Sequence, residues 1–460
     1  MKLTTKINKN IFREYDIRGI YGQDLNEDVA YTIGKSFGSY IRKMDCMETI
    51  IGHDNRLSSP LLTDALIKGI LSTGVNVINL GLVTTPMYYY ARKFYNIKTG
   101  IMVTASHNPK DDNGFKMAFD EKGNAYGKLI LDFLDFTMRQ NFIDGYGIEI
   151  TRNIKDDYLE LIKKSIKLGN KKIKAVVDCG NGTGSIIIKD IFNELGIEYY
   201  PLYCDSDGNF PNHHPDPSVS KNLKDLSKKV KELGYDIGIG IDGDADRVGI
   251  VDETGKVIPA DLYMLIVARN IVTKMKNKKI MFDVKCSKSL IDELIKLNIE
   301  PVMYRTGNSY TCRMMQDGDF DFGGEYSGHI YFRDKFPGID DGIYAGLRMI
   351  EILSNTDKKL SELLKGINKY YSTEEVKIAV PDDKKFKLVD YVKKYARKRK
   401  YDTCELDGVR INFDYGWALV RASNTGPNIT MRFEANKKEL LKNLENEFTN
   451  IINEFLNEKA

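Results

Sequence analysis

Long apolar runs are missing from this sequence. Runs such as residues 262–268 are far too short to span a bilayer. The first ten residues, MKLTTKINKN, also lack the apolar core that a signal peptide needs. We therefore expect a soluble, cytoplasmic protein that has no membrane partner.

Paired cysteines and an excess of one charge are missing as well. The six cysteines are scattered over 460 residues without a CxxC pair. This is typical of reduced thiols in a cytosolic protein and disfavours disulfides or a zinc site. Lys and Arg total 68 against 65 Asp and Glu, which leaves a formal net charge of +3. A general nucleic-acid binder needs a larger basic excess, so nucleic acid is not an expected partner.

The chain is long and apolar enough for several compact cores. Its 460 residues, 42% of them hydrophobic, predict about three or four domains. Short β-branched runs, such as residues 173–178 and 279–284, alternate with amphipathic stretches, such as residues 223–233 and 287–297. This alternation predicts α/β layers with largely parallel sheets.

The last part of the chain has a different pattern. Strand-like residues 409–413, 417–422 and 428–434 follow one another around tight turns, and a helical pattern over 437–456 comes after them. This order predicts an α+β domain built on an antiparallel sheet. We expect four domains, over residues 1–152, 153–257, 258–368 and 369–460.

A serine-containing turn follows the apolar strand expected over residues 100–103. It reads Thr104-Ala105-Ser106-His107-Asn108-Pro109. A serine at the end of a strand lies where α/β proteins bind their ligands, so Ser106 is a candidate nucleophile or phosphate carrier. An isolated motif of this kind is more often an ordinary turn or helix cap. A serine hydrolase is disfavoured because the G-x-S-x-G elbow is absent.

Three carboxylates lie close together in Asp242-Gly243-Asp244-Ala245-Asp246-Arg247, between two apolar strands. Alternate residues of an extended segment point the same way, so these side chains can converge on one point. Three like charges at such a distance repel one another unless a cation lies between them. Oxygen ligands without His or Cys favour Mg²⁺ over zinc. A calcium-binding EF-hand is disfavoured, because Arg247 takes the place of the required glycine and strands rather than helices are expected on both sides.

The segment Gly324-Glu325-Tyr326-Ser327-Gly328-His329 supplies an acceptor, a donor and a titratable group on a loop between glycines. These groups suit contacts with sugar hydroxyls and the transfer of a proton. Taken alone, a structural loop is the simpler interpretation of this segment.

A turn rich in hydroxyl groups, residues 421–428, lies between two of the C-terminal strands. It carries Arg421, and Arg432 follows on the next strand. Guanidinium groups bind phosphate oxygens in a bidentate way, and N–H groups of a turn can add to the binding. Both a phosphate site and an ordinary hairpin turn fit this segment.

Taken together, the four segments closely resemble the α-D-phosphohexomutase superfamily, and within it the bacterial phosphomannomutase/phosphoglucomutase group. The resemblance extends over the whole chain, from Phe12-Arg13-Glu14-Tyr15-Asp16-Ile17-Arg18-Gly19 to the C-terminal turn. It implies four domains around a central cleft, of which the first three share a mixed α/β fold. It also implies a mutase that interconverts hexose 1-phosphate and hexose 6-phosphate of mannose or glucose, through a phosphoserine and a hexose 1,6-bisphosphate.

The resemblance implies roles for individual residues as well. One Mg²⁺ per chain would be held by Asp242, Asp244, Asp246 and the phosphate on Ser106. The catalytic residues would be Ser106, Arg18, Lys116, Arg247 and His329. Contacts with the sugar and the non-reacting phosphate would come from Tyr15, Lys285, Asn308, Glu325, Ser327, His329, Arg421, Ser423, Asn424, Thr425 and Arg432.

The sequence departs from the family pattern at Asn308, where close relatives often carry histidine. Asparagine cannot carry a proton in transfer, so an acid or base at this place would have to be His329, Lys116 or another group. Two other functions stay open. A metal-dependent sugar phosphatase could use the same serine and aspartates, and a non-catalytic sugar-phosphate-binding protein could use the same cleft. The expected partner is a small sugar phosphate, and the expected assembly is a monomer or a weak homo-oligomer.

Overall fold

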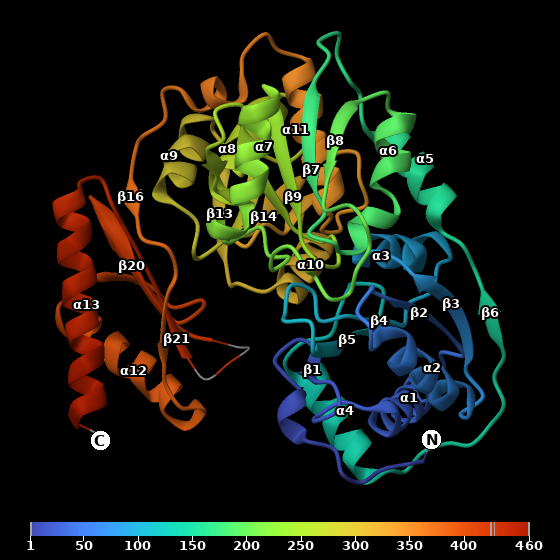
Figure 1. Cartoon of the computed structure of the whole chain (residues 1–460). Helices are drawn as coiled ribbons and strands as arrows, with labels where there is room; N and C mark the ends of the chain where they lie inside the picture. Colours follow the sequence, from blue (N-terminus) through green and yellow to red (C-terminus); the bar gives the residue numbers. More distant parts are fainter. Residues whose placement is uncertain (1, 424–425, 427, 459–460) are drawn as a thin grey trace.

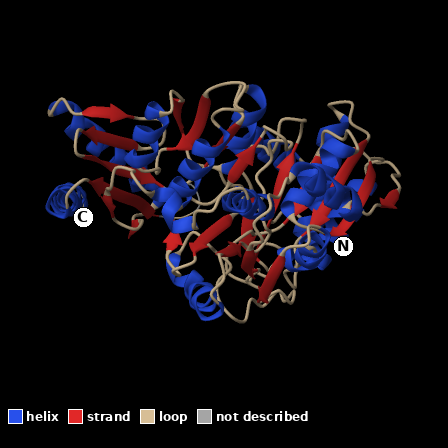
Figure 2. Cartoon of the chain, turned by 90° about the horizontal axis from the view of Figure 1, so that it is seen from above, coloured by secondary structure: helices blue, strands red, loops and turns tan. Residues whose placement is uncertain are grey.

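The computed structural model describes residues 2–423, 426 and 428–458, which form four domains, each with its own β-sheet (Figure 1). The first three domains are α/β and the C-terminal domain is α+β, as the sequence predicts. The N-terminal and C-terminal domains lie at opposite ends of the molecule (Figure 2). The boundary residues between the domains stay predictions.

The first domain has a six-stranded sheet in the order β1-β5-β4-β2-β3-β6. Strands β4, β2, β3 and β6 run parallel, whereas β5 pairs antiparallel with both β4 and β1. The sheet is therefore mixed, because β5 runs antiparallel to its two neighbours. The elements are β1 (Ile17–Ile20), α1 (Glu27–Arg42), β2 (Glu48–His53), α2 (Ser59–Leu71), β3 (Asn76–Leu82), α3 (Thr85–Phe94), β4 (Gly100–Val103), β5 (Asp112–Ala118), α4 (Lys128–Arg139) and β6 (Glu149–Thr151).

The second domain has a five-stranded sheet in the order β11-β10-β9-β7-β8. Strands β9, β7 and β8 are parallel, and β9 continues into β10 as an antiparallel hairpin. The elements are α5 (Lys155–Ser165), β7 (Lys174–Asp178), α6 (Ile188–Glu194), β8 (Glu198–Leu202), α7 (Lys224–Leu233), β9 (Ile237–Ile241), β10 (Val248–Asp252) and β11 (Val257–Ile258).

The third domain has a four-stranded sheet in the order β13-β12-β14-β15, in which only β14 and β15 are antiparallel. Its elements are α8 (Ala260–Ile271), β12 (Lys279–Asp283), α9 (Lys288–Lys296), β13 (Glu300–Tyr304), α10 (Asn308–Asp317), β14 (Phe322–Gly324), β15 (Ile330–Phe332) and α11 (Gly342–Ser354).

The C-terminal domain has an antiparallel sheet in the order β16-β21-β20-β19-β18, with β17 also paired to β21. Its elements are β16 (Tyr371–Ser372), β17 (Val376–Ala379), α12 (Asp382–Lys398), β18 (Asp402–Cys404), β19 (Val409–Phe413), β20 (Gly416–Ala422), β21 (Asn428–Ala435) and α13 (Lys438–Glu458). Short 3₁₀ helices elsewhere span Lys9–Ile11, Thr183–Ile186, Ser220–Leu223 and Leu360–Leu364.

Each of the four motifs singled out in the sequence connects two antiparallel neighbours in a sheet. The Ser106 loop joins β4 to β5, and the aspartate loop joins β9 to β10. The Glu325 loop joins β14 to β15, and the turn after Arg421 joins β20 to β21. All four motifs therefore lie at sheet ends, where the backbone turns and polar side chains need not pack into a core.

The apolar cores are distributed unevenly among the domains. One continuous core includes residues of the first three domains, among them Tyr88 of α3, Ile239 of β9 and Leu347 of α11. Helix α11 approaches β9 closely, because Gly346 has no side chain to meet Ile239. The C-terminal domain has a separate core that includes Val420 and Phe448. Among the described residues, no helix has the length and apolar character needed to cross a membrane.

Candidate active site

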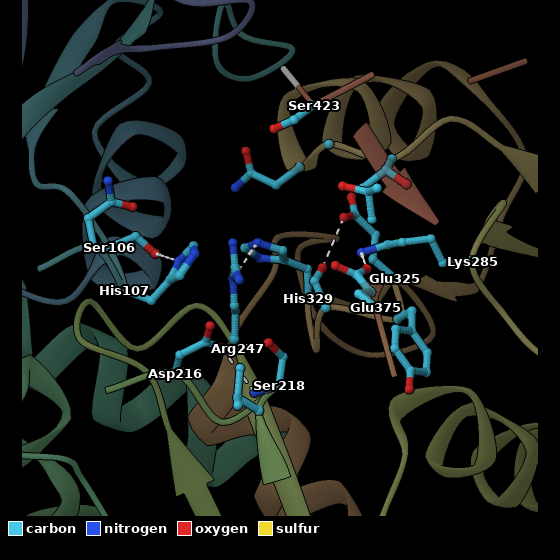
Figure 3. A pocket seen from close by; sticks show the side chains of 18 of the residues that line it. Ser106, His107, Asp216, Ser218, Arg247, Lys285, Glu325, His329, Glu375 and Ser423 are labelled. Carbon is cyan, nitrogen blue, oxygen red and sulfur yellow. Dashed lines mark hydrogen bonds and ion pairs between the residues drawn. The ribbon is translucent and has the colours of Figure 1, made fainter. Parts of the chain in front are cut away.

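One cavity of about 330 Å³ is lined by residues from all four domains. Ser106 and His107 face Lys285, Glu325 and Glu375 across it, with Arg247 and His329 between them (Figure 3). The predicted site residues that line it are Tyr15, Arg18, Ser106, Lys116, Arg247, Lys285, Asn308, Glu325, Ser327, His329, Arg421 and Ser423. Asn424 and Thr425 lie outside the described residues.

Ser106 is held in an unusual backbone conformation at the end of β4. Its φ angle is 51°, in the left-handed region that residues with a side chain seldom adopt. The backbone N–H of Ser106 donates to Oγ1 of Thr104 at 2.8 Å. The Ser106 hydroxyl donates to Oδ2 of Asp242 at 3.0 Å and lies 3.2 Å from Nδ1 of His107. The candidate nucleophile therefore points at the aspartate loop of the next domain.

The three aspartates of the β9–β10 loop are fully buried, and their carboxylate oxygens lie within 4.8 Å of one another. Burial, together with Asp246 and Asp244, raises the pKa of Asp242 well above its usual value. Burial also acts to raise the pKa of Asp244, but the Lys116 ammonium 2.7 Å away lowers that pKa overall. The raised pKa of Asp242 thus reflects both its burial and the repulsion among the three carboxylates.

The aspartate set fits a divalent cation. Oδ1 of Asp244 and Oδ1 of Asp246 are buried and accept no hydrogen bond within the part of the chain that the structure describes. Buried carboxylate oxygens without a donor are costly, and a hard cation such as Mg²⁺ would satisfy them. Ser106 lies beside the same set, so a phosphate there would also reach the cation.

Lys116, on β5, contacts two of these aspartates. Its Nζ lies 2.7 Å from Oδ2 of Asp244 and 2.6 Å from Oδ2 of Asp246. Burial acts to lower its pKa, but the two carboxylates outweigh burial and raise the pKa well above its usual value. The two carboxylates therefore favour the charged ammonium form of Lys116.

His329 follows the β14–β15 turn and contacts residues of two loops. Its Nε2 accepts a hydrogen bond from Nε of Arg247 at 2.9 Å. Its Nδ1 lies 2.8 Å from Oδ2 of Asp340 and 3.4 Å from Oδ1 of Asp246. Burial acts to lower the pKa of His329, but these carboxylates raise it overall.

The opposite wall of the cavity carries hydrogen-bonding groups suited to a sugar. Glu325 accepts hydrogen bonds from Thr311, at 2.7 Å, and from Ser327, at 3.1 Å. Burial raises the pKa of Glu325. The amide of Asn308 donates to Oδ2 of Asp340 at 2.9 Å, so Asn308 and His329 share one carboxylate.

Two cations, Lys285 and Arg421, line the part of the cavity next to the C-terminal domain, to which Arg421 belongs. Lys285 Nζ lies 2.9 Å from Oε1 of Glu375, and Arg421 Nε donates to Oδ2 of Asp407 at 2.9 Å. Arg432 does not line the cavity. Its guanidinium lies 3.5 Å from the centre of the Tyr326 ring and donates to the backbone carbonyl of Lys285.

Several lining residues were not predicted from the sequence. Asp16, His107, Asn108 and Tyr326 lie inside the quoted sequence motifs, although no role was assigned to them. The others have no local signal, because distant parts of the chain bring them together. The unpredicted lining residues are Asp16, His107, Asn108, Asp216, Ser218, Val219, Ser220, Thr306, Gly307, Tyr326, Glu374, Glu375, Lys377 and Thr430.

The same four-part organisation is found in known proteins. Profiles described as Phosphoglucomutase/phosphomannomutase, alpha/beta/alpha domains I, II and III match residues 9–129, 156–255 and 259–370. The profile of the C-terminal domain of the same proteins matches residues 375–451. The chain belongs to the phosphoglucomutase/phosphomannomutase family.

Individual members of this family are similar over nearly their whole length. The phosphomannomutase/phosphoglucomutase of Pseudomonas putida is 40% identical over 444 residues, 95% of this chain and 94% of that protein. A phosphoglucomutase of Neisseria meningitidis serogroup A is 37% identical over 452 residues, 97% of each chain. The crystal structure of a phosphoglucomutase/phosphomannomutase family protein from Burkholderia thailandensis superposes with a TM-score of 0.90, at 34% identity, and covers 98% of both chains. The chain is therefore a phosphotransferase of the mutase type.

Proposed function

We propose that the protein is a phosphohexomutase that moves a phosphoryl group between the C1 and C6 oxygens of mannose and glucose phosphates through Ser106. The observation that supports the proposal is that one cavity is lined by two separate groups of cationic side chains, each of which could bind a phosphate. Arg18 donates to Asn108 of the Ser106 loop, and Lys116 and Arg247 contact the aspartates beside Ser106. Lys285 faces Ser106 across the cavity, and both Lys285 and Arg421 lie close to Glu375. A phosphatase needs only the first group, but a mutase must hold one phosphate while it transfers the other.

At the reacting end, a phosphate on Ser106 would carry about −1.5 to −2 charges near neutral pH. Asp242, Asp244 and Asp246 would hold one Mg²⁺, which supplies positive charge beside that phosphate. Arg18 donates to Asn108 of the Ser106 loop, and Nε of Arg247 lies 3.8 Å from Oδ2 of Asp242, so both would bind the remaining phosphate oxygens. Phosphoryl transfer depends mainly on this kind of positioning and charge stabilisation.

In the transfer step, a sugar hydroxyl oxygen forms a bond to phosphorus while the bond from phosphorus to Oγ of Ser106 breaks. The hydroxyl proton must go to a base, and His329 is the residue we assign to it. The bonding electron pair stays on Oγ of Ser106, which takes up a proton from water and becomes a hydroxyl again. His329 has a nitrogen that accepts a hydrogen bond, whereas Lys116 is held as an ammonium by two carboxylates. The product of this half-reaction is a hexose 1,6-bisphosphate. It would turn around in the cavity and return its other phosphoryl group to Ser106.

At the other end, Lys285, Arg421 and Ser423 would bind the phosphate that does not react. Binding this remote group positions the acceptor hydroxyl and so lowers the barrier at the other end of the sugar. The remaining roles are assigned from where each side chain lies relative to the cavity. Glu325, Ser327, Asn308 and Tyr15 would contact the sugar, and Arg432 would support Lys285 from behind the cavity wall.

The test is a coupled assay with glucose 1-phosphate and mannose 1-phosphate, each with a trace of the corresponding 1,6-bisphosphate. We expect formation of the 6-phosphate of at least one sugar and, by intact mass and peptide mapping, phosphate on Ser106. Release of inorganic phosphate at the same rate would indicate a phosphatase. Binding without turnover would indicate a sugar-phosphate-binding protein. The variant Ser106→Ala should lose turnover by several orders of magnitude and still bind substrate.

A further inference from the structure

Arg56 lies beneath the Ser106 loop and is fully buried. Its guanidinium donates to four backbone carbonyls of this loop. Nη2 donates to Ser106 O at 2.8 Å and to Asn108 O at 2.7 Å. Nη1 donates to Pro109 O at 2.5 Å and to Asp112 O at 3.0 Å. One side chain thus fixes the loop from the candidate nucleophile to the start of β5.

The orientation of Arg56 is itself fixed by Asp54. Nε of Arg56 donates to Oδ2 of Asp54 at 3.2 Å, and the backbone N–H of Arg56 donates to Oδ1 at 3.0 Å. With the four carbonyls, all five N–H donors of the guanidinium have an acceptor. The backbone N–H of Asp54 donates to Val103 O at 3.0 Å, which connects the pair to the end of β4. A lysine at position 56 has three donors from a single atom and cannot reproduce this geometry.

The loop needs such support because Ser106 adopts a strained conformation. A residue with a side chain at φ 51° persists only where its surroundings hold it there. The carbonyl of Ser106 is restrained from two sides. Arg56 binds it, and the backbone of the aspartate loop approaches so closely that a side chain at Gly243 would lie 2.5 Å from this oxygen. Rotation of this peptide would move the Ser106 hydroxyl away from Asp242.

The second domain also covers Arg56. The centre of the Phe210 ring lies 5.3 Å from Cζ of Arg56. Nearby, Gly208 lies against the backbone carbonyl of Asn55, where a side chain would come within 2.3 Å. These contacts of Phe210 and Gly208 keep water away from the hydrogen bonds of Arg56. They also couple the Ser106 loop to the domain that carries the aspartates.

We infer that Arg56 is a positioning residue for phosphoryl transfer, which holds the Ser106 loop so that the serine oxygen faces the aspartate set. The inference rests on the proposed mutase function. Arg56 does not line the cavity, so it acts through Ser106 and not by contact with the substrate. Loss of Arg56 should therefore impair the transfer step much more than substrate binding.

The test is Arg56→Lys, which keeps the positive charge but cannot form the five hydrogen bonds of the guanidinium group. Steady-state and single-turnover rates are measured at a temperature where circular dichroism shows a folded protein. We expect kcat to fall by about 10²-fold, the scale of a small misplacement of a reacting group, while KM stays within about threefold. Phe210→Ala, which leaves Arg56 and its hydrogen bonds in place, should lower kcat by a smaller factor and serves if Arg56→Lys does not fold.

Arg348→Lys is the matched control. Arg348 is equally buried and binds Asp334 at 2.8 Å through two nitrogens, away from the cavity. The control should lose thermal stability but keep kcat within about twofold. The inference is overturned if every folded Arg56 or Phe210 variant keeps the wild-type kcat, or if kcat falls no further than in Arg348→Lys. A wild-type protein without mutase turnover, or without phosphate on Ser106, would contradict the proposed function instead.

Discussion

The hydroxyl of Ser106 donates a hydrogen bond to Oδ2 of Asp242 at 3.0 Å, although 136 positions separate the two residues in the sequence. The bond crosses from the β4–β5 hairpin of one domain to the β9–β10 hairpin of the next. The candidate nucleophile and the candidate metal ligands therefore form a single unit only when two domains are correctly packed. Changes to the aspartates should affect metal binding and phosphoryl transfer together.

Asp244→Asn should weaken Mg²⁺ binding and lower turnover. The change keeps the shape of the side chain but removes one negative charge from the set and leaves Lys116 beside fewer carboxylates. We expect Mg²⁺ affinity, measured by calorimetric titration, to fall by more than about 10-fold, since changes even outside the ligand shell commonly cost 10- to 100-fold. Asp205→Asn, at an exposed position of the same domain, is the control. Full activity of the wild type in excess chelator would contradict the metal assignment.

Arg421→Ala should weaken binding of the sugar phosphate, because Arg421 would bind the phosphate that does not react. A charge-assisted hydrogen bond contributes about 1.5–3 kcal/mol, so kcat/KM should fall by about 10- to 100-fold, mainly through KM. Asp407→Asn leaves Arg421 in place and removes only its 2.9 Å partner, so a smaller effect is expected. An unchanged kcat/KM for Arg421→Ala would show that this end of the cavity binds no phosphate.

Asp341→Asn should change how stability depends on pH. Burial raises the pKa of Asp341 to about 7, whereas an aspartate in the unfolded chain titrates near 4. Between these pH values the folded chain holds a proton that the unfolded chain has lost. The contribution of Asp341 to stability is therefore fully present below about pH 4 and is lost as the pH rises through 7, by about 4 kcal/mol at most.

Denaturant unfolding at several pH values measures this contribution as the difference between Asp341→Asn and wild type. We expect the difference to shift in favour of the variant between pH 4 and 7, because the amide does not ionise. The amide can still accept from the backbone N–H of Tyr344, which caps α11 in the wild type. Asp357→Asn, at an exposed site, should show a constant difference. A constant difference for Asp341→Asn as well would refute the raised pKa.

Glucose and mannose phosphates should both be substrates. The two sugars differ only at C2, and the sugar must bind in two orientations that exchange C1 and C6. Glu325 and Ser327 can contact the 3- and 4-hydroxyls in both orientations, but the C2 hydroxyl changes place. The epimers should therefore differ by no more than about 10²-fold in kcat/KM. A preference of about 10⁴-fold in parallel assays would mean that C2 is specifically hydrogen-bonded, for example by Asn308.

Local patterns in the sequence were sufficient for much of the fold. The strands over 100–103 and 409–413 have the predicted bounds, because their apolar runs are flanked by turn residues. Strand β5 was missed, since its sequence DNGFKMA begins with three residues typical of turns. Lys116 lies on this strand, and its role was predicted only from the family resemblance.

The site could be predicted where its residues are close in sequence. The Ser106, Asp242 and Glu325 segments each contain several functional groups, and the structure brings them to one cavity. Glu375 and Arg56 could not be found this way, because each has its role through a partner far along the chain. Arg56 lies 50 positions before Ser106, and an arginine in a turn carries no sign that its side chain will be buried.

The uneven distribution of the apolar cores has a consequence for cooperativity. One core runs through the first three domains, although the first domain also has a second core of its own, so these domains cannot separate without exposing apolar surface. The C-terminal domain keeps its own core. In native-state hydrogen exchange the chain should therefore behave as two units rather than four. Amides around Val420 and Phe448 should exchange independently, whereas those of α3, β9 and α11, which contribute to the shared core, should share one opening free energy.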